Sequence, residues 1–262
     1  MNPKNRINQL FQNKKENILS VYFTAGYPDP EETVPLIEGL EKHGVDLIEI
    51  GMPFSDPVAD GPVIQHSSHI ALENGMSVKK LFEQLKDIRK KTTIPLILMG
   101  YLNPVLQFGV ENFCKKCAEV GIDGLILPDL PLDVYKEEFR ILFEQYGLHN
   151  ILLITPQTSE KRLREIDEAS SGFIYMVSSS STTGMKSKVS DFHQDYFERI
   201  KNMHLKNPRL IGFGISNQET FVNACKYAQG AIIGSAFVKA LDEDITLDGK
   251  ISNFVKLILK TT

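Results

Sequence analysis

The sequence is short of cysteine, has no long apolar run and carries little excess charge of either sign. Its three cysteines are an odd number, and a chain of 262 residues can bury a core without a disulfide scaffold. Cys114 and Cys117 form a C-x-x-C motif, but within a helical pattern that offers neither metal-ligand partners nor thioredoxin-like surroundings. We therefore expect reduced, packed thiols.

The apolar runs fall short of the roughly 18 residues that a membrane helix needs, and the polar stretch MNPKNRINQLFQNKKEN lacks the apolar centre of a secretory signal. These absences predict a cytoplasmic protein with no membrane partner. The net charge is −4 at pH 7 and Lys and Arg are scattered, so no nucleic-acid partner is expected. With 42% hydrophobic and 24% charged residues, the composition is that of an ordinary globular protein.

Short β-rich apolar runs alternate with longer amphipathic segments along the chain. The eight runs are ILSVYFTA, VDLIEIG, IPLILMG, IDGLILPD, NILLITP, FIYMVSSS, PRLIGFG and AIIGSAF. Each is nearly continuously apolar, as expected of parallel strands covered on both faces, and helical periodicity marks the segments between them. The predicted helices span residues 32–43, 77–90, 110–119, 134–146, 160–169, 192–203, 218–226 and 249–260.

Eight strand and helix units in strict alternation favour one α/β domain over residues 1–262, a single (β/α)8 TIM barrel. The length agrees, because such barrels have roughly 250 residues. The first dozen residues are expected to add an extra N-terminal helix that plugs the barrel floor. An open doubly wound sheet shares the alternation and the right-handed crossovers, and it is the structural alternative.

Chemistry in such a barrel is expected where strands end. Glu49 lies near the end of the second run, on the same side as Val45 and Leu47 because strand side chains alternate. If that side is the barrel interior, burial raises the pKa of the carboxyl, which suits a group that both donates and accepts a proton. The alternative is that Glu49 faces the helix layer and pairs with a cation. Spacing alone does not decide between them.

The segment after Glu49, GMPFSDPVADGPVIQ, is too rich in Pro, Gly and Asp to be a mere connection, and we interpret it as a shaped loop. Asp60 is one loop away from Glu49, so the two carboxylates can converge on one ligand with separable roles. Asp56 and Asp60 are also residues that commonly form turns and cap helices before Pro and Gly. For Asp56, spacing favours that structural role.

The last two units resemble a phosphate-binding site. Gly212 and Gly214 flank Phe213 at the end of the seventh run, and Gly234 precedes Ser235 at a predicted helix start. Glycines let the backbone approach an anion closely, and free N–H groups at a helix start bind it. Glycines also end strands routinely in tight turns. Both pairs together, in units seven and eight, indicate a small phosphorylated metabolite.

The segment SSSSTTGMKSKVSD follows the sixth run and is rich in hydroxyl groups. A floppy surface loop is one interpretation, but we favour a lid, because the segment starts where substrate must enter. Thr183 and Gly184 would then close the phosphate side. His66 and His69 are three apart on one helix face, and without a third ligand no metal site is expected.

Glu49 followed by GMPFSDPVADGPVIQ resembles the signature of tryptophan synthase alpha chains, and the string P-F-S-D-P-x-A-D-G-P is highly specific. Similar motifs follow in the family's order and spacing: VYFTAGYPD, the PDLP at 128–131, Tyr175, the Thr183-Gly184 pair, GFGIS and IIGSAFVK. The resemblance implies a TIM-barrel lyase. Its reaction would be the retro-aldol cleavage of indole-3-glycerol phosphate to indole and glyceraldehyde 3-phosphate in L-tryptophan biosynthesis.

By the same resemblance, Glu49 is the acid and base that moves protons between indole C3 and the glycerol hydroxyl. Asp60 would accept the indole N–H and stabilise the positive charge that develops when C3 is protonated. Tyr175 and Thr183 would position the substrate. The candidates for the indole pocket are Tyr22, Met99 and Ile126. The phosphate would be held by Gly184, Phe213, Gly214, Gly234 and Ser235. The barrel itself would need no cofactor or metal.

The resemblance also implies a partner, a pyridoxal-phosphate beta chain that receives indole through a tunnel in an αββα heterotetramer. Pro53, Asp56, Asn103 and Pro104 fall in loops that usually face this partner in the family. Asp56 thereby gains a role that spacing alone does not supply.

Three positions depart from the pattern of many family members. Ser179 and Ser181 stand in the lid where an Arg and a Gly are common, and Ile70 stands where an Arg is common. The activity is still expected, because both carboxylates and the phosphate glycines are present. One alternative is another phosphate-binding barrel, such as an isomerase or indole-glycerol-phosphate synthase, although no run offers the lysine that such a synthase needs. The other is a catalytically weak barrel that acts mainly as an allosteric partner of a beta chain.

Overall fold

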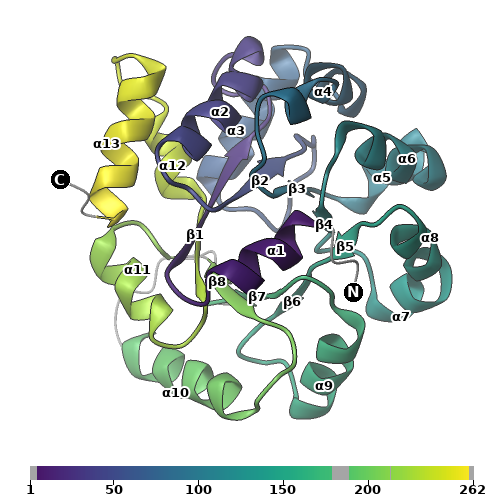
Figure 1. Ribbon diagram of the computed structural model, residues 1–262, viewed down its shortest axis with the longest axis vertical. Helices are drawn as coiled ribbons and strands as arrows, with labels where there is room; N and C mark the ends of the chain where they lie inside the picture. Colours follow the sequence, from purple (N-terminus) through teal and green to yellow (C-terminus); the bar gives the residue numbers. More distant parts are fainter. Residues whose placement is uncertain (1–4, 179–188, 213, 260–262) are drawn as a thin grey trace.

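The computed structural model describes residues 5–178, 189–212 and 214–259. Within them, a ring of helices surrounds a central barrel of parallel strands (Figure 1). The strands are β1 (Ile18–Thr24), β2 (Leu47–Gly51), β3 (Leu96–Met99), β4 (Gly124–Ile126), β5 (His149–Asn150), β6 (Leu152–Ile154), β7 (Ile174–Val177), β8 (Arg209–Gly212) and β9 (Gly230–Ile233). Every predicted run contains a strand, and the barrel is confirmed in preference to the open sheet.

The strands pair in the order β5-β4-β3-β2-β1-β9-β8-β7-β6. β5 and β6 stand at opposite ends of this order, yet only Ile151 separates them in the chain. The fifth predicted run is therefore one barrel strand in two halves. Its first half pairs with β4 and its second half with β7. This division brings the two ends of the sheet together.

The helices are α1 (Arg6–Asn13), α2 (Thr33–Lys42), α3 (Pro62–Glu73), α4 (Val78–Leu85), α5 (Leu102–Phe108), α6 (Val110–Val120), α7 (Leu132–Val134), α8 (Arg140–Gln145), α9 (Glu160–Ala169), α10 (Val189–Asn202), α11 (Gln218–Cys225), α12 (Ser235–Ala240) and α13 (Leu247–Leu259). Short 3₁₀ turns occupy Pro30–Glu32 and Ile88–Lys90, and a π-helical turn, Tyr135–Phe139, joins α7 to α8. α5 is absent from the predicted helices, and α3 was expected only as the helix that carries His66 and His69, without bounds. α3 starts at Pro62, in the first turn, where a missing N–H costs no hydrogen bond.

Local sequence fixes several helix starts. The side chains of Ser77 and Ser159 each accept a hydrogen bond from a backbone N–H three residues further on, at the starts of α4 and α9. Asn217 and Thr220 form a reciprocal capping box at the start of α11. Caps of this kind satisfy N–H groups that a helix leaves unpaired, and each stabilises the fold by about 1 kcal/mol.

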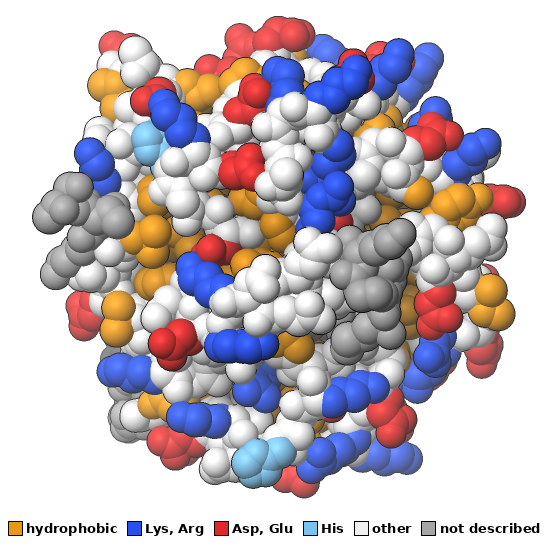
Figure 2. Space-filling view, viewed as in Figure 1, with side chains coloured by type: hydrophobic (Ala, Val, Ile, Leu, Met, Phe, Trp, Pro, Cys, Tyr) orange, Lys and Arg blue, Asp and Glu red, His pale blue; other side chains and the backbone are white. Residues whose placement is uncertain are grey.

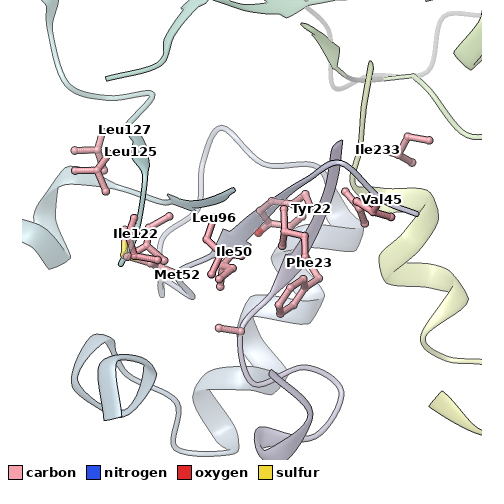
Figure 3. Packing of buried hydrophobic residues seen from close by; sticks show 14 of the residues in the cluster. Tyr22, Phe23, Val45, Ile50, Met52, Leu96, Ile122, Leu125, Leu127 and Ile233 are labelled. Atoms are coloured by element: carbon pink, nitrogen blue, oxygen red, sulfur yellow. The ribbon is translucent and has the colours of Figure 1, made fainter. Parts of the chain in front are cut away.

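Strand side chains alternate between two buried layers. The inner layer, within the barrel, includes Ile18, Leu47, Ile97, Ile126, Phe173, Leu210 and Ile232. The outer layer lies between strands and helices, and Figure 3 shows part of it, with Phe23, Ile50 and Leu96 on three adjacent strands. Both faces of most strands are therefore largely apolar. Full burial of each such side chain contributes roughly 1.5–3 kcal/mol, which is why the runs show no polar alternation.

The helix α1 lies across one end of the barrel (Figure 1), and Ile7 on it belongs to the inner layer. The side-chain amide of Asn5 donates to the carbonyl oxygens of Asp123 and Gly147, at 2.8 and 3.0 Å. The guanidinium of Arg6 lies 3.0 Å from the Asp123 carboxylate. The structure thus contains the predicted N-terminal helix, fastened to the floor of the barrel.

Figure 2 shows this floor from outside, with basic and acidic side chains interspersed. No single-sign area spreads over the face in view, which agrees with the scattered charge in the sequence. In the described part of the chain, no helix combines the length and apolar character needed to cross a bilayer.

Candidate active site

A cavity of about 650 Å³ opens where the strands end, on the side of the barrel away from α1. Glu49 and Asp60 both line it, together with Gly234 and Ser235. Other described residues on its wall are Tyr22, Phe54, Ile64, Met99, Tyr101, Leu153, Thr155, Tyr175, Gly214, Ser216 and Lys239. The two carboxylates and the glycine-rich end therefore share one space.

Glu49 points into the barrel, from a strand whose Leu47 belongs to the inner layer. Its side chain is 0% exposed. Oε1 accepts a hydrogen bond from the Ser20 hydroxyl at 2.9 Å, while Oε2 has no hydrogen-bond partner among the described residues. Burial raises the pKa of Glu49 to about 8, opposed by the Ser20 hydrogen bond. Of the two orientations left open by the spacing, the structure has the interior one.

Asp60 lies partly buried in the loop before α3. The Tyr101 hydroxyl donates to its Oδ2 at 3.1 Å and accepts from the Ala59 backbone N–H at 3.0 Å. Burial raises the pKa of Asp60, and the Tyr101 hydrogen bond opposes this. Tyr101 thus ties the carboxylate to the start of α5.

Two tyrosines, Tyr22 and Tyr175, line the cavity from β1 and β7 and are almost fully buried. Burial raises the pKa of both phenols, and the nearby carboxylates raise it further, so both stay neutral. A Cβ atom at Gly51 would lie 2.1 Å from the Tyr22 hydroxyl, and one at Gly212 would lie 2.1 Å from the Tyr175 hydroxyl. Glycine at these two strand ends leaves room for the rings.

Elsewhere on the cavity wall, Gly214 has φ of +73°, a conformation that favours glycine, and Gly234 immediately precedes α12. Ser235 opens that helix. Lys239, one helical turn further on, is the single Lys, Arg or His among the described cavity-lining residues. This end offers backbone N–H groups, a hydroxyl and one positive charge to an anion.

Several predicted residues are not described. Thr183, Gly184 and Phe213, and the lid positions Ser179 and Ser181, lie outside the described residues. Met99 lines the cavity as predicted for an indole-pocket residue, whereas Ile126 is packed in the inner layer and does not belong to the described cavity wall. Ile70 packs, partly buried, against the outer layer from α3.

The four residues predicted to face a partner are not alike. Pro53 is buried, while Asp56 is exposed in the loop after β2. Asn103 and Pro104 were predicted in a loop, and this is wrong, because both belong to the first turn of α5. A proline is accommodated there since the first turn makes no internal hydrogen bond through its N–H groups. Asn103 is exposed.

Sequence reasoning missed six polar residues at or beside the cavity. These are Ser20, Ser68, Tyr101, Thr155, Ser216 and Lys239. Lys239 could have been predicted from the sequence, because it stands four residues after Ser235 and thus on the same side of a short helix. Ser20 and Tyr101 could not have been predicted, since their hydrogen-bond partners depend on strand register and on the path of a loop.

The other side chains considered for metals or redox chemistry lie apart from the cavity. His66 and His69 are exposed on α3, and His69 pairs with Glu73 at 3.3 Å. Cys114 and Cys117 are fully buried free thiols, and burial raises the pKa of both. Among the described residues there is no group of three or more His, Cys, Asp or Glu able to hold a metal ion.

These features define the class of the protein. Two carboxylates, one with a pKa of about 8, share one cavity with a glycine-rich end suited to an anion, at the strand ends of a (β/α)8 barrel. Such a set of groups suits acid–base cleavage of a small phosphorylated molecule. The class is therefore that of a TIM-barrel lyase.

Comparisons with known proteins give the family. The sequence model described as tryptophan synthase alpha chain matches residues 8–261. The tryptophan synthase alpha chain of Flavobacterium johnsoniae is 62% identical over 251 residues, 96% of this chain and 98% of the relative. That of Christiangramia forsetii is 60% identical over 258 residues, 98% of this chain and 100% of the relative.

Solved structures agree. Tryptophan synthase subunit alpha from Legionella pneumophila superposes with a TM-score of 0.86 at 32% identity and covers 97% of both chains. A chain of the tryptophan synthase complex from Pyrococcus furiosus gives a TM-score of 0.84 at 34% identity, covering 95% of this chain and 100% of that one. The chain belongs to the tryptophan synthase alpha chain family. It is a lyase of the alpha reaction in tryptophan biosynthesis.

Proposed function

We propose that the chain cleaves indole-3-glycerol phosphate to indole and glyceraldehyde 3-phosphate, with Glu49 as the acid and base. The observation that carries this is the buried Glu49 carboxyl on the wall of the cavity, with a pKa of about 8 and one oxygen that has no hydrogen-bond partner among the described residues. At neutral pH it holds a proton that it can give to indole C3. It can then take the proton of the adjacent glycerol hydroxyl as the carbon–carbon bond breaks. The bond electrons return to the ring, and both products leave neutral at the reacting atoms.

Asp60 has a separate role in this proposal. Protonation at C3 places positive charge on the indole nitrogen, and a carboxylate that accepts its N–H stabilises that charge. The partly buried position of Asp60 strengthens the interaction, because little water screens it. Tyr101 holds the carboxylate in place through its 3.1 Å hydrogen bond. Tyr22, Met99 and Tyr175 would enclose the ring from the cavity wall. Because protons are all that moves besides the bond electrons, we propose that the chain needs no cofactor of its own.

The substrate phosphate would bind at the glycine-rich end of the cavity, on the backbone of Gly214 and Gly234 and on Ser235. Lys239 would add a positive charge there, since a phosphate dianion gains from any cation within a few ångströms. This arrangement fixes the substrate at one end and places its reacting carbon between the two carboxylates. Thr183, Gly184 and Phe213 complete the proposed phosphate and substrate contacts on grounds of family resemblance alone.

The proposed partner is a tryptophan synthase beta chain carrying pyridoxal phosphate, in an αββα heterotetramer. Support comes from relatives whose structures are described as tryptophan synthase complexes, such as that from Pyrococcus furiosus. On this chain, Val58 and Leu106 are large apolar side chains exposed to 86% and 51%, beside Asp56 and Asn103 respectively. Exposed apolar side chains on a loop and on a nearby helix are what a partner surface would cover.

The test is indole release from indole-3-glycerol phosphate, followed with the chain alone and with a beta chain added. We expect measurable release alone and faster release with the partner. Absence of release under both conditions would refute the proposal and favour a barrel that serves only as an allosteric partner. A Val58→Lys variant should keep the rate of the isolated chain and lose most of the increase on adding the beta chain. An undiminished increase would place the partner surface elsewhere.

A further inference from the structure

Ser20 lies on β1 inside the barrel and is 0% exposed. Its hydroxyl donates to Glu49 Oε1 at 2.9 Å. In the register of the two strands, Ser20 stands opposite Leu47 and Tyr22 stands opposite Glu49. The hydrogen bond therefore runs diagonally from β1 to the carboxylate on β2, from the side of the barrel floor.

The surroundings of Ser20 make this hydroxyl unusual. The inner layer at this depth consists of apolar side chains such as Ile18, Leu47 and Ile232. A buried hydroxyl without a partner costs free energy, and a serine fills less of the interior than the branched residues around it. The bond to Glu49 is the one side-chain hydrogen bond that the structure gives Ser20 within its described part. Packing alone does not account for serine here.

The two oxygens of Glu49 are thereby made unequal. Oε1 is directed toward Ser20 and the barrel floor, whereas Oε2 has no hydrogen-bond partner in the described chain although it is buried. The residue itself lines the cavity. Oε2 therefore has unused hydrogen-bonding capacity, in a residue that lines the cavity.

We propose that Ser20 is a positioning residue for the alpha reaction, holding Glu49 Oε1 so that Oε2 is the oxygen that exchanges protons with the substrate. The inference rests on the proposed acid–base role of Glu49. It adds a group that touches no substrate and acts only through the carboxylate. Fixing one oxygen saves the side-chain entropy that a free carboxylate loses when it reaches the geometry for proton transfer.

The same hydrogen bond also sets the ionisation of Glu49. A donor to a carboxylate favours the charged form, and it opposes the burial that raises the pKa of Glu49 to about 8. The other titratable groups considered near Glu49 on the cavity wall are the phenols of Tyr22 and Tyr175, which are neutral, and the carboxyl of Asp60. Without the Ser20 hydroxyl, the described residues offer no other donor to hold the pKa of Glu49 down, and this pKa should rise.

The experiment compares Ser20→Ala and Ser20→Thr with the wild-type chain, using indole-3-glycerol phosphate over a range of pH. For Ser20→Ala we expect kcat to fall about tenfold, with KM changed less than about twofold, because the substrate is bound by other residues. Activity of the wild type should decline above about pH 8, and in Ser20→Ala this decline should occur roughly one pH unit higher. A shift of this size is expected for loss of one hydrogen bond to a charged group. Ser20→Thr keeps the hydroxyl and should recover most of kcat and the original pH dependence.

The matched control is Ser170→Ala. Ser170 is also a buried serine with side-chain hydrogen bonds, to the carbonyl oxygens of Phe173 and Asn150, but it caps the end of α9 and does not line the cavity. This variant should keep the wild-type pH profile even where its melting temperature falls. Equal pH profiles for Ser20→Ala and the wild type, or equal losses in both alanine variants, would overturn the positioning role and leave Ser20 a structural residue.

Glu49→Gln, measured in parallel, separates this inference from the function on which it rests. If Glu49→Gln keeps full turnover, the acid–base assignment fails, and the role of Ser20 falls with it. If Glu49→Gln is inactive while Ser20→Ala retains kcat and pH profile, only the inference about Ser20 fails. The infrared band of the Glu49 carboxylic acid, followed against pH in wild type and Ser20→Ala, measures the expected pKa rise without any turnover.

Discussion

The Glu49→Gln variant should become more stable relative to the wild type as pH rises. The folded wild type keeps its buried carboxyl protonated above the ordinary pKa, which costs stability, whereas the amide does not ionise. The pKa of Glu49 is raised from an ordinary 4.5 to about 8 by burial. Below pH 4.5 the carboxyl is protonated in both folded and unfolded chains, and there is no difference. Between pH 4.5 and 8 the unfolded chain releases this proton while the folded chain keeps it, so wild-type stability falls with pH. Above pH 8 the loss is complete.

The magnitude follows from the gap between those two pKa values. Each unit corresponds to roughly 1.4 kcal/mol, so the whole interval amounts to about 5 kcal/mol. The Gln side chain has nearly the same shape and does not ionise. A difference in packing or hydrogen bonding between Glu and Gln changes the free energy of unfolding by the same amount at every pH. The ionisation of Glu49 instead makes the difference between the two chains change with pH.

Urea titrations at half-unit steps from pH 4 to pH 9 give the free energy of unfolding for both chains. The difference, variant minus wild type, should rise by about 1 kcal/mol or more per pH unit between pH 5 and 8 and then level off. Asp60→Asn is a useful second comparison, since it removes a carboxyl from the same cavity but leaves Glu49 in place. A difference that stays flat across the interval would refute the reasoning, because it would mean that Glu49 ionises in the folded protein as it does in water.

The remaining predictions concern the proposed site and the barrel floor. Asp60→Asn should lower kcat by about a hundredfold or more, as for loss of one charge-stabilising group, with a smaller change in KM; initial rates of indole release measure both. Lys239→Met should raise KM several-fold with little change in kcat, and the difference from wild type should shrink in high salt as the charge is screened; rates at two ionic strengths decide this. Asp123→Ala should destabilise the fold by about 3 kcal/mol, because Asp123 pairs with Arg6 at 3.0 Å and with the largely buried Arg89 at 2.8 Å. Urea unfolding measures the loss, and a fall in melting temperature no larger than that of Ser170→Ala would contradict it.

The strands were predictable from the sequence because both of their faces are buried. Eight nearly continuous apolar runs leave few structures other than a parallel barrel. The division of the fifth strand at Ile151 was not visible, since it depends on which neighbour each half meets. The start of the helix α3 was not predicted, for a different reason. Pro62 and the glycine before it suggest a loop, yet they mark the first turn of a helix.

The site was predictable in composition but not in orientation. Alternation placed Glu49 on one of two faces, and only the closed barrel determines that this face is the interior. The hydrogen bonds from Ser20 and Tyr101 join residues 29 and 41 positions apart in the chain. Such pairs depend on strand register and on the path of a loop, neither of which the periodicity of a single sequence contains. The proposed roles of these residues stay predictions until the variants are measured.

The fastening of α1 to the barrel has a consequence for molecular traffic. In the part of the chain that the structure describes, the floor of the barrel is closed by Ile7, which packs in the inner layer, and by the bonds of Asn5 and Arg6 to Asp123. The described cavity therefore opens at the strand ends and not through this floor. Entry of substrate and departure of products at the strand ends then both contribute to the turnover time.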